Sequence, residues 1–195
     1  MSKAVLLTCG LLLATASIAD EAQNISVENV SVEIVTSVGT MTVELWPSKA
    51  PQTVRNFLER VDESFYDGLI FHRVIANFMI QGGGFDPEMN ERKAPQTVVN
   101  ESANGEPNRL WTIAMARRAD PDSAEAQFYI NAKDNDHLNA RPGQPGYTVF
   151  GKLTAGMDVA EAIELTDTGT FAGFPDVPLT PIVIETIRRV EPLAD

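Results

Sequence analysis

Residues 71–85 read FHRVIANFMIQGGGF, which places the cation of Arg73 and the amide of Gln81 among large apolar side chains before a run of glycines. Two short β-prone runs, 71–75 and 78–80, lie within this segment. Between them, Ala76-Asn77 is typical of a bend, because asparagine tolerates the backbone angles that a bend requires. The combination is typical of a binding surface.

Alternation in the first run predicts which side chains share a face. Phe71, Arg73 and Ile75 would lie on one face of the strand, and His72 and Val74 on the other. The guanidinium of Arg73 is therefore expected among apolar neighbours, and His72 is expected to be a structural histidine rather than a base. An isolated arginine beside aromatic residues is also typical of a surface side chain whose stem covers apolar area, so the pattern alone leaves both interpretations open.

The glycine run after Gln81 does not match a nucleotide-binding loop. It lacks the lysine and the serine or threonine of a phosphate-cradling loop, and its spacing is not that of a dinucleotide fingerprint. Tight backbone packing or a β-bulge is the expected reason for these glycines.

The start of the chain is typical of a secretory signal peptide, because Lys3 precedes an uncharged run rich in leucine and alanine that ends in small residues at Ala19. We therefore expect residues 1–19 to be a signal peptide, residues 20–28 a flexible arm, and residues 29–195 one domain. A retained membrane anchor is the alternative interpretation of the leader.

Composition excludes several classes of function. The formal net charge of −12 argues against binding to nucleic acid or to an anionic membrane. Cys9, the one cysteine, lies in the leader, so the mature chain would hold no disulfide and no thiolate ligand. His72 and His137 are the two histidines and stand far apart, so we expect no metal site and no cofactor.

Periodicity along the chain predicts a mainly β fold with long polar loops. The loops are expected at 86–108, 117–126 and 135–147, with a further Gly/Pro-rich loop before the last strand. Strands are expected at 30–34, 41–45, 71–75, 78–80, 111–116, 127–131, 147–153 and 181–190, and helices at 51–61 and 157–165. Eight strands without β-α-β alternation favour a closed antiparallel barrel over a parallel sheet.

The segment 71–85 closely resembles the signature of the cyclophilin family of peptidyl-prolyl isomerases. Members read Phe-His-Arg, two β-branched residues, a short bend, Phe-Met, one residue and Gln-Gly-Gly. The resemblance extends over residues 30–190, and residues 99–102 and 111–117 are most similar to the bacterial periplasmic members. It implies a closed eight-stranded antiparallel β-barrel capped by two α-helices, with ligands bound on an outer face.

The resemblance also implies an active site. Arg73 matches the catalytic arginine, a role that suits a guanidinium because rotation about X-Pro breaks no covalent bond and needs a donor aimed at the prolyl nitrogen. The positions that match the family's substrate-binding residues are Phe78, Met79, Gln81, Ala116, Arg117, Gln127, Tyr129, His137, Leu138 and Tyr147.

Four of these positions depart from common family residues. His137 stands where many eukaryotic members have tryptophan, and Tyr147 where they have histidine. Arg117 replaces a frequent asparagine, and Tyr129 occupies a position usually filled by phenylalanine. Because the tryptophan position is tied to cyclosporin binding, we expect weak inhibition by that drug with catalysis retained.

The sequence thus predicts a periplasmic peptidyl-prolyl cis-trans isomerase that assists the folding of exported proteins. Its expected partners are proline-containing peptides and unfolded exported proteins, with no nucleic acid, no membrane after signal cleavage, and a monomeric state. The alternative is a non-catalytic barrel of the same fold that binds proline-containing segments as a chaperone.

Overall fold

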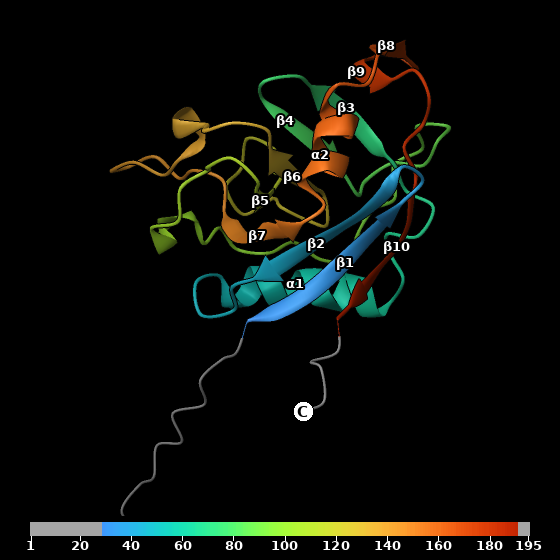
Figure 1. Ribbon diagram of the computed structural model, residues 1–195. Helices are drawn as coiled ribbons and strands as arrows, with labels where there is room; N and C mark the ends of the chain where they lie inside the picture. The colour runs from blue at the N-terminus through green and yellow to red at the C-terminus, as the bar shows by residue number, and fades with distance from the viewer. Residues whose placement is uncertain (1–28, 191–195) are drawn as a thin grey trace, which may run out of the picture.

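The computed structural model describes residues 29–190 of the 195-residue chain, so the expected signal peptide (residues 1–19) and the expected arm (residues 20–28) both lie outside the described residues. Figure 1 shows a mainly β structure. The described residues contain two α-helices. In chain order the elements are β1 (Val30–Thr36), β2 (Gly39–Leu45), α1 (Pro51–Asp62), β3 (Phe71–Ile75), β4 (Met79–Gly82), β5 (Thr112–Met115), β6 (Phe128–Asn131), β7 (Val149–Ala155), α2 (Met157–Glu164), β8 (Thr168–Phe171), β9 (Phe174–Pro178) and β10 (Ile184–Arg189). Two 3-10 turns, η1 (Ser102–Asn104) and η2 (Asp136–Leu138), lie in the long loops.

Eight strands form one curled antiparallel sheet in the order β10-β1-β2-β7-β5-β6-β4-β3. The prediction of a closed barrel is wrong in this detail, because the end strands β10 and β3 do not pair with each other. They approach through a bridge between Ile70 and Val183 and through Phe71 N, which donates to Ile182 O at 3.0 Å. Pro181 lies just before β10 and, having no N–H group, cannot donate a ladder hydrogen bond there.

The core lies inside the curl of the sheet. Phe57 of α1 is fully buried, and its ring centroid lies 5.3 Å from that of Tyr66, 5.8 Å from that of Phe128 and 5.3 Å from that of Phe150. The helix begins at Pro51, and the predicted apolar stripe that contains Phe57 is buried along its length. Both predicted helices are confirmed. In the described part of the chain, no helix is long and apolar enough to cross a membrane.

A β-bulge changes the predicted faces of β3. Phe71 pairs with Gly82 and Arg73 pairs with Gln81, so His72 is an extra residue on the bulged strand. As a result Phe71 faces the core with Val74, while Arg73 lies on the other side. The prediction that Phe71 and Arg73 share a face is therefore wrong. The prediction that His72 lies opposite Arg73 is also wrong, since His72 and Arg73 line the same cavity.

The bend and the glycines behave as expected. Asn77 has φ 55°, in the left-handed region that asparagine tolerates. A Cβ atom on Gly82 would lie 3.1 Å from Ile70 O, and Gly83 has φ 80° and packs against the ring of Tyr66. Close backbone packing accounts for this part of the run.

The Gly/Pro-rich segment after α2 was predicted to be a loop, but it forms the hairpin β8–β9. Ala172 and Gly173 connect its strands, with φ values of 49° and 84°. Positive φ at both positions is typical of a tight hairpin turn. The turn lacks the usual Asn-Gly pair, and Pro175 and Pro178 obscure the strand pattern. This hairpin packs against β3, which carries Arg73 (Figure 1).

Candidate active site

An apolar cluster lies on the side of the sheet opposite the core. Alternation along β6 sends Phe128 and Ile130 into the core and Tyr129 to the other side, where it meets Met79 of β4 and Ala114 of β5. The cluster consists of buried Met79, Ala114, Tyr129 and Val149 with partly buried Trp46, Ile75, Phe78, Ala116, Leu138 and Tyr147. Six of the predicted substrate-binding residues are therefore brought together.

His137 and Tyr147 extend the cluster from the loop 135–147. The His137 ring stacks on Phe78, with centroids 5.6 Å apart and planes 25° apart. The Tyr147 ring meets Tyr129 edge to face, with centroids 5.8 Å apart. Tyr147 N donates to Leu138 O at 3.0 Å, which ties the two ends of this loop together.

A polar edge borders the apolar cluster. The Arg73 pairing with Gln81 across β3 and β4 places both side chains beside Gln127, whose Oε1 accepts from Gln81 Nε2 at 3.1 Å. These three residues and Ala116 line a cavity of about 330 Å³. A Cβ atom on Gly84 would collide with the Gln127 side chain, so glycine is needed for Gln127 to occupy this place.

Arg73 is held loosely. Its side chain is 41% exposed, and its Nε lies 3.7 Å from Asp176 Oδ2 on β9. This contact uses Nε and leaves the two terminal nitrogens of the guanidinium outside it. Asp176 was not predicted as a site residue, because the segment that carries it was expected to be a loop.

Arg117 is occupied by contacts within the protein. Its Nε donates to Gly146 O at 3.2 Å and its Nη2 to Pro145 O at 2.9 Å, while the guanidinium carbon lies 4.7 Å from the centroid of the Tyr147 ring. Nη1 donates to Arg118 O at 3.0 Å. Arg117 therefore joins the loop 117–126 to the loop 135–147.

A cluster of ion pairs on the far rim of the cavity was also not predicted from the sequence. Arg118 Nη1 lies 2.8 Å from Glu125 Oε1, and Arg118 Nη2 lies 3.0 Å from Glu91 Oε1. All three residues line the cavity beside Arg73. They come from loops with no periodic pattern, so their meeting depends on the folded chain.

His72 lines the cavity from its buried side and is 5% exposed. Its ring centroid is 4.7 Å from that of Phe85, and burial lowers the pKa of His72 to about 4, against a smaller raising effect of the Ile70 carbonyl. The imidazole is therefore neutral near pH 7, which suits a structural histidine.

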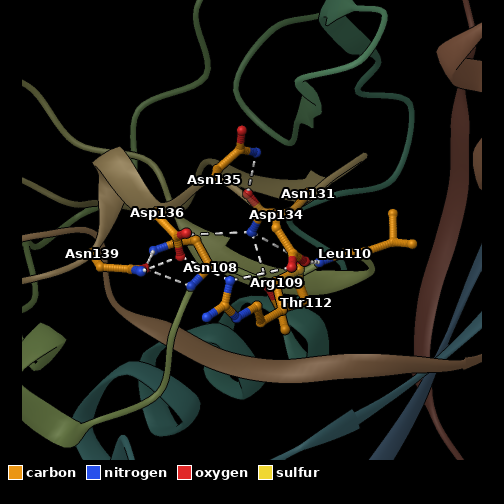
Figure 2. A network of polar contacts seen from close by, with 9 residues as sticks. All are labelled: Asn108, Arg109, Leu110, Thr112, Asn131, Asp134, Asn135, Asp136 and Asn139. Carbon is orange, nitrogen blue, oxygen red and sulfur yellow. Dashed lines mark hydrogen bonds and ion pairs between the residues drawn. The ribbon is translucent and has the colours of Figure 1, made fainter.

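Behind the apolar cluster lie three buried asparagines, Asn108, Asn131 and Asn135. Figure 2 shows their side chains meeting between strands β5 and β6 and the loop that carries η2. Asn108 and Asn135 lie in loops, where asparagine is typical of turns, and Asn131 ends β6, so no sequence pattern predicts that the three would form a network.

Within residues 29–190, no three histidine, cysteine, aspartate or glutamate side chains are grouped so that they could hold a metal ion. What the site offers is a guanidinium, two amides and a dry apolar surface. Such a set can bind and polarise an amide without bond cleavage.

Comparison with known proteins shows the family of this chain. Residues 31–189 match the family described as cyclophilin type peptidyl-prolyl cis-trans isomerase/CLD. The chain belongs to this family. As a cyclophilin it is a peptidyl-prolyl cis-trans isomerase, and the resemblance in residues 71–85 is confirmed over most of the chain.

Bacterial relatives are also named peptidyl-prolyl cis-trans isomerases. A peptidyl-prolyl cis-trans isomerase of Streptomyces antibioticus is 49% identical over 161 residues, which cover 81% of this cyclophilin and 97% of the relative. Peptidyl-prolyl cis-trans isomerase B of Escherichia coli is 44% identical over 160 residues, covering 80% and 97% of the two chains.

Solved structures agree with the fold. A crystal structure of a cyclophilin type peptidyl-prolyl cis-trans isomerase of Cryptosporidium parvum, obtained in the presence of the dipeptide Ala-Pro, superposes with a TM-score of 0.69 at 24% identity. The match covers 83% of this cyclophilin and 99% of that chain.

Proposed function

We propose that this cyclophilin accelerates rotation about X-Pro bonds in exported proteins and that Arg73 is its catalytic residue. The supporting observation is one juxtaposition: the guanidinium of Arg73 stands at the edge between the apolar cluster and the Gln81–Gln127 pair. A substrate bound there would have its proline ring on the apolar surface and its backbone beside the amides.

The chemistry needs no nucleophile and no base. Rotation about an amide faces a barrier of ~18–20 kcal/mol because the nitrogen lone pair is delocalised into the carbonyl. A fixed cationic donor aimed at the prolyl nitrogen favours the twisted form, in which the lone pair is localised. The guanidinium of Arg73 offers its N–H groups in a fixed planar arrangement, which suits this task.

The apolar cluster supplies the binding surface in this proposal. Phe78, Met79, Tyr129 and Leu138 would surround the proline ring, and Gln81 and Gln127 would hold the flanking backbone. That a Cryptosporidium parvum relative was crystallised in the presence of Ala-Pro supports a proline-containing peptide as the ligand. Ala116, His137 and Tyr147 would complete the groove, with Arg117 supporting it through Tyr147.

The proposed task can be tested with a protein client. Uncatalysed X-Pro isomerisation takes tens to hundreds of seconds and limits the refolding of many proteins. We expect the mature chain, in catalytic amounts, to shorten the slow refolding phase of an exported protein with a native cis-proline, and Arg73→Ala to leave it unchanged. A wild type that isomerises peptides but leaves this phase unaltered would contradict the folding role.

The proposed place of action is the periplasm, supported by the leader-like composition of residues 1–19. We expect the protein in a periplasmic extract to begin at Asp20 and to sediment as a monomer, since no second chain is needed to complete the apolar cluster. Recovery of an intact amino terminus from the membrane fraction would favour the anchor instead.

A further inference from the structure

The hydroxyl of Tyr129 has a task apart from lining the apolar cluster. It donates to Asn108 Oδ1 at 2.7 Å, and both residues are buried. Burial raises the pKa of Tyr129 well above its ordinary value, so the proton stays on the hydroxyl. The other donor to Asn108 Oδ1 is Asn131 Nδ2, at the longer distance of 3.3 Å. The tyrosine therefore makes the shorter of the two bonds.

Asn108 in turn holds both ends of the turn η2. On one side, Asn135 N donates to Asn108 O at 2.8 Å. On the other, Asn139 Oδ1 accepts from Asn108 N at 2.7 Å and from Asn108 Nδ2 at 3.1 Å. Asn135 and Asn139 flank the residues Asp136–Leu138, so one buried side chain and its backbone fix the whole turn (Figure 2).

The same network reaches Phe78 on the opposite wall. Asn135 Nδ2 donates to Phe78 O at 2.8 Å and to Asn131 Oδ1 at 2.8 Å. The His137 ring of the turn stacks on the Phe78 ring. The positions of Phe78, His137 and Leu138 relative to Tyr129 are thus set through shared buried amides.

Exposed contacts also tie the turn, but they are the weaker ones. Arg109 Nη1 lies 2.8 Å from Asp136 Oδ1 and 3.2 Å from Asp134 Oδ2, and the side chains are between 49% and 68% exposed. Surface ion pairs are screened by solvent and salt and contribute little, whereas an unsatisfied buried amide is costly. The inner bonds therefore decide where the turn lies.

We propose that the Tyr129 hydroxyl is a positioning group which, through Asn108, holds the turn carrying His137 and Leu138 against Phe78 and so sets how tightly the site binds a proline ring. This inference rests on the proposed function of the apolar cluster. The ring of Tyr129 contributes apolar surface that a phenylalanine would match, so the hydroxyl can be removed by itself.

The test is Tyr129→Phe assayed on a short Ala-Pro peptide. We expect KM to rise about fivefold, as for the loss of one buried hydrogen bond, with kcat within about twofold of wild type. Asn139→Ala, which removes the acceptor at the far end, should change KM in the same direction. Circular dichroism and thermal unfolding establish that both variants fold.

A matched control separates positioning from stability. Thr36→Val removes another buried hydroxyl, whose Oγ1 donates to Gly39 O at 2.7 Å in the β1–β2 turn, away from the apolar cluster. It should destabilise the fold by a similar amount and leave KM unchanged. Equal rises in KM for Thr36→Val and Tyr129→Phe, or no rise for Tyr129→Phe, would overturn the inference.

A second readout does not depend on turnover. In NMR spectra the ring signals of His137 should shift in Tyr129→Phe, because its stacking on Phe78 loosens, and should stay in place in Thr36→Val. Unmoved His137 signals would overturn the positioning role even if the wild type is active. An inactive wild type with shifted His137 signals would instead count against the proposed function alone.

Discussion

At the scale of single residues, His72 links the site to the pH dependence of stability. Its folded-state pKa of about 4 lies below the ordinary value of 6.5, chiefly because burial disfavours the charged ring. Between these two pH values the unfolded chain binds more protons than the folded one, so stability falls as pH is lowered from 6.5 toward 4. The loss levels off below the folded-state pKa.

We therefore expect the free energy of unfolding in urea to drop by up to about 3 kcal/mol between pH 7 and pH 4 because of this residue. His72→Gln should remove most of that slope. Asp62 and Asp86, whose pKa values are lowered from 3.8 by hydrogen bonds with Arg189 and Asn90 respectively, contribute at more acidic pH. Equal slopes for wild type and His72→Gln would show that His72 is not the responsible group.

The apolar residues of the candidate site could be predicted from the sequence, but the residues that hold the site in place could not. Phe78 and Met79 could be predicted because they belong to the signature in residues 71–85, and Tyr129 because it lies on a strand with a recognisable pattern. Asn108 and Asp176 could not, since each comes from a segment without periodicity and acquires its role when distant segments meet.

At the scale of elements, the hairpin β8–β9 adds an acidic residue to the site. Asp176 stands 3.7 Å from Arg73 and has φ 61°, a conformation that asparagine also tolerates. Asp176→Asn therefore removes the charge and leaves the backbone unstrained. Because the pair is exposed, the change should cost less than about 1 kcal/mol of stability.

We expect Asp176→Asn to lower kcat/KM about threefold at low salt, because the Arg73 guanidinium loses an orienting partner. The difference in kcat/KM between the variant and wild type should shrink near 0.5 M salt, because salt screens the charges. Asp167→Asn, an equal charge change near the base of the same hairpin, is the control. Higher activity in Asp176→Asn would mean that Asp176 competes with the substrate for Arg73.

Strands and helices were predictable where one periodicity ran without interruption, as in the first hairpin and in α1. The prediction failed where local chemistry interrupts the period. A bulge at His72 rotates Phe71 into the core, and prolines in β9 hide a strand pair. A bulge leaves no pattern in the sequence, and the prolines interrupt the alternation by which a strand is predicted.

At the scale of the whole molecule, the curled sheet and α1 share one core centred on Phe57. Its ring contacts three other aromatic rings from different elements. We expect Phe57→Ala to cost about 3–5 kcal/mol, as large-to-small changes in packed cores do. Thermal unfolding should remain a single transition at a lower midpoint.

The surface at Val38, which is half exposed, offers the control. Val38→Ala should change stability by less than about 0.5 kcal/mol. Two separate unfolding transitions in Phe57→Ala would contradict the view that α1 and the sheet form one cooperative unit.

The open sheet also explains where the site lies. Because the inside of the curl is filled by the core, the outer side of β3, β4, β5 and β6 is the surface left for a substrate. The sequence predicted this outer location through family resemblance. Closure of the sheet was predicted wrongly, since it depends on a few hydrogen bonds between the segments around Ile70 and Ile182, for which the sequence has no pattern.

The most direct measurement of the central claim is the cis-to-trans rate of a short Ala-Pro peptide with wild type, Arg73→Lys, Arg73→Ala and, as a control on exposed arginine, Arg55→Ala. We predict that Arg73→Ala lowers kcat/KM about a hundredfold and Arg73→Lys about tenfold, because lysine keeps the charge and loses the planar donors. Arg55→Ala should equal wild type. A correctly folded Arg73→Ala with wild-type kcat/KM would contradict the account.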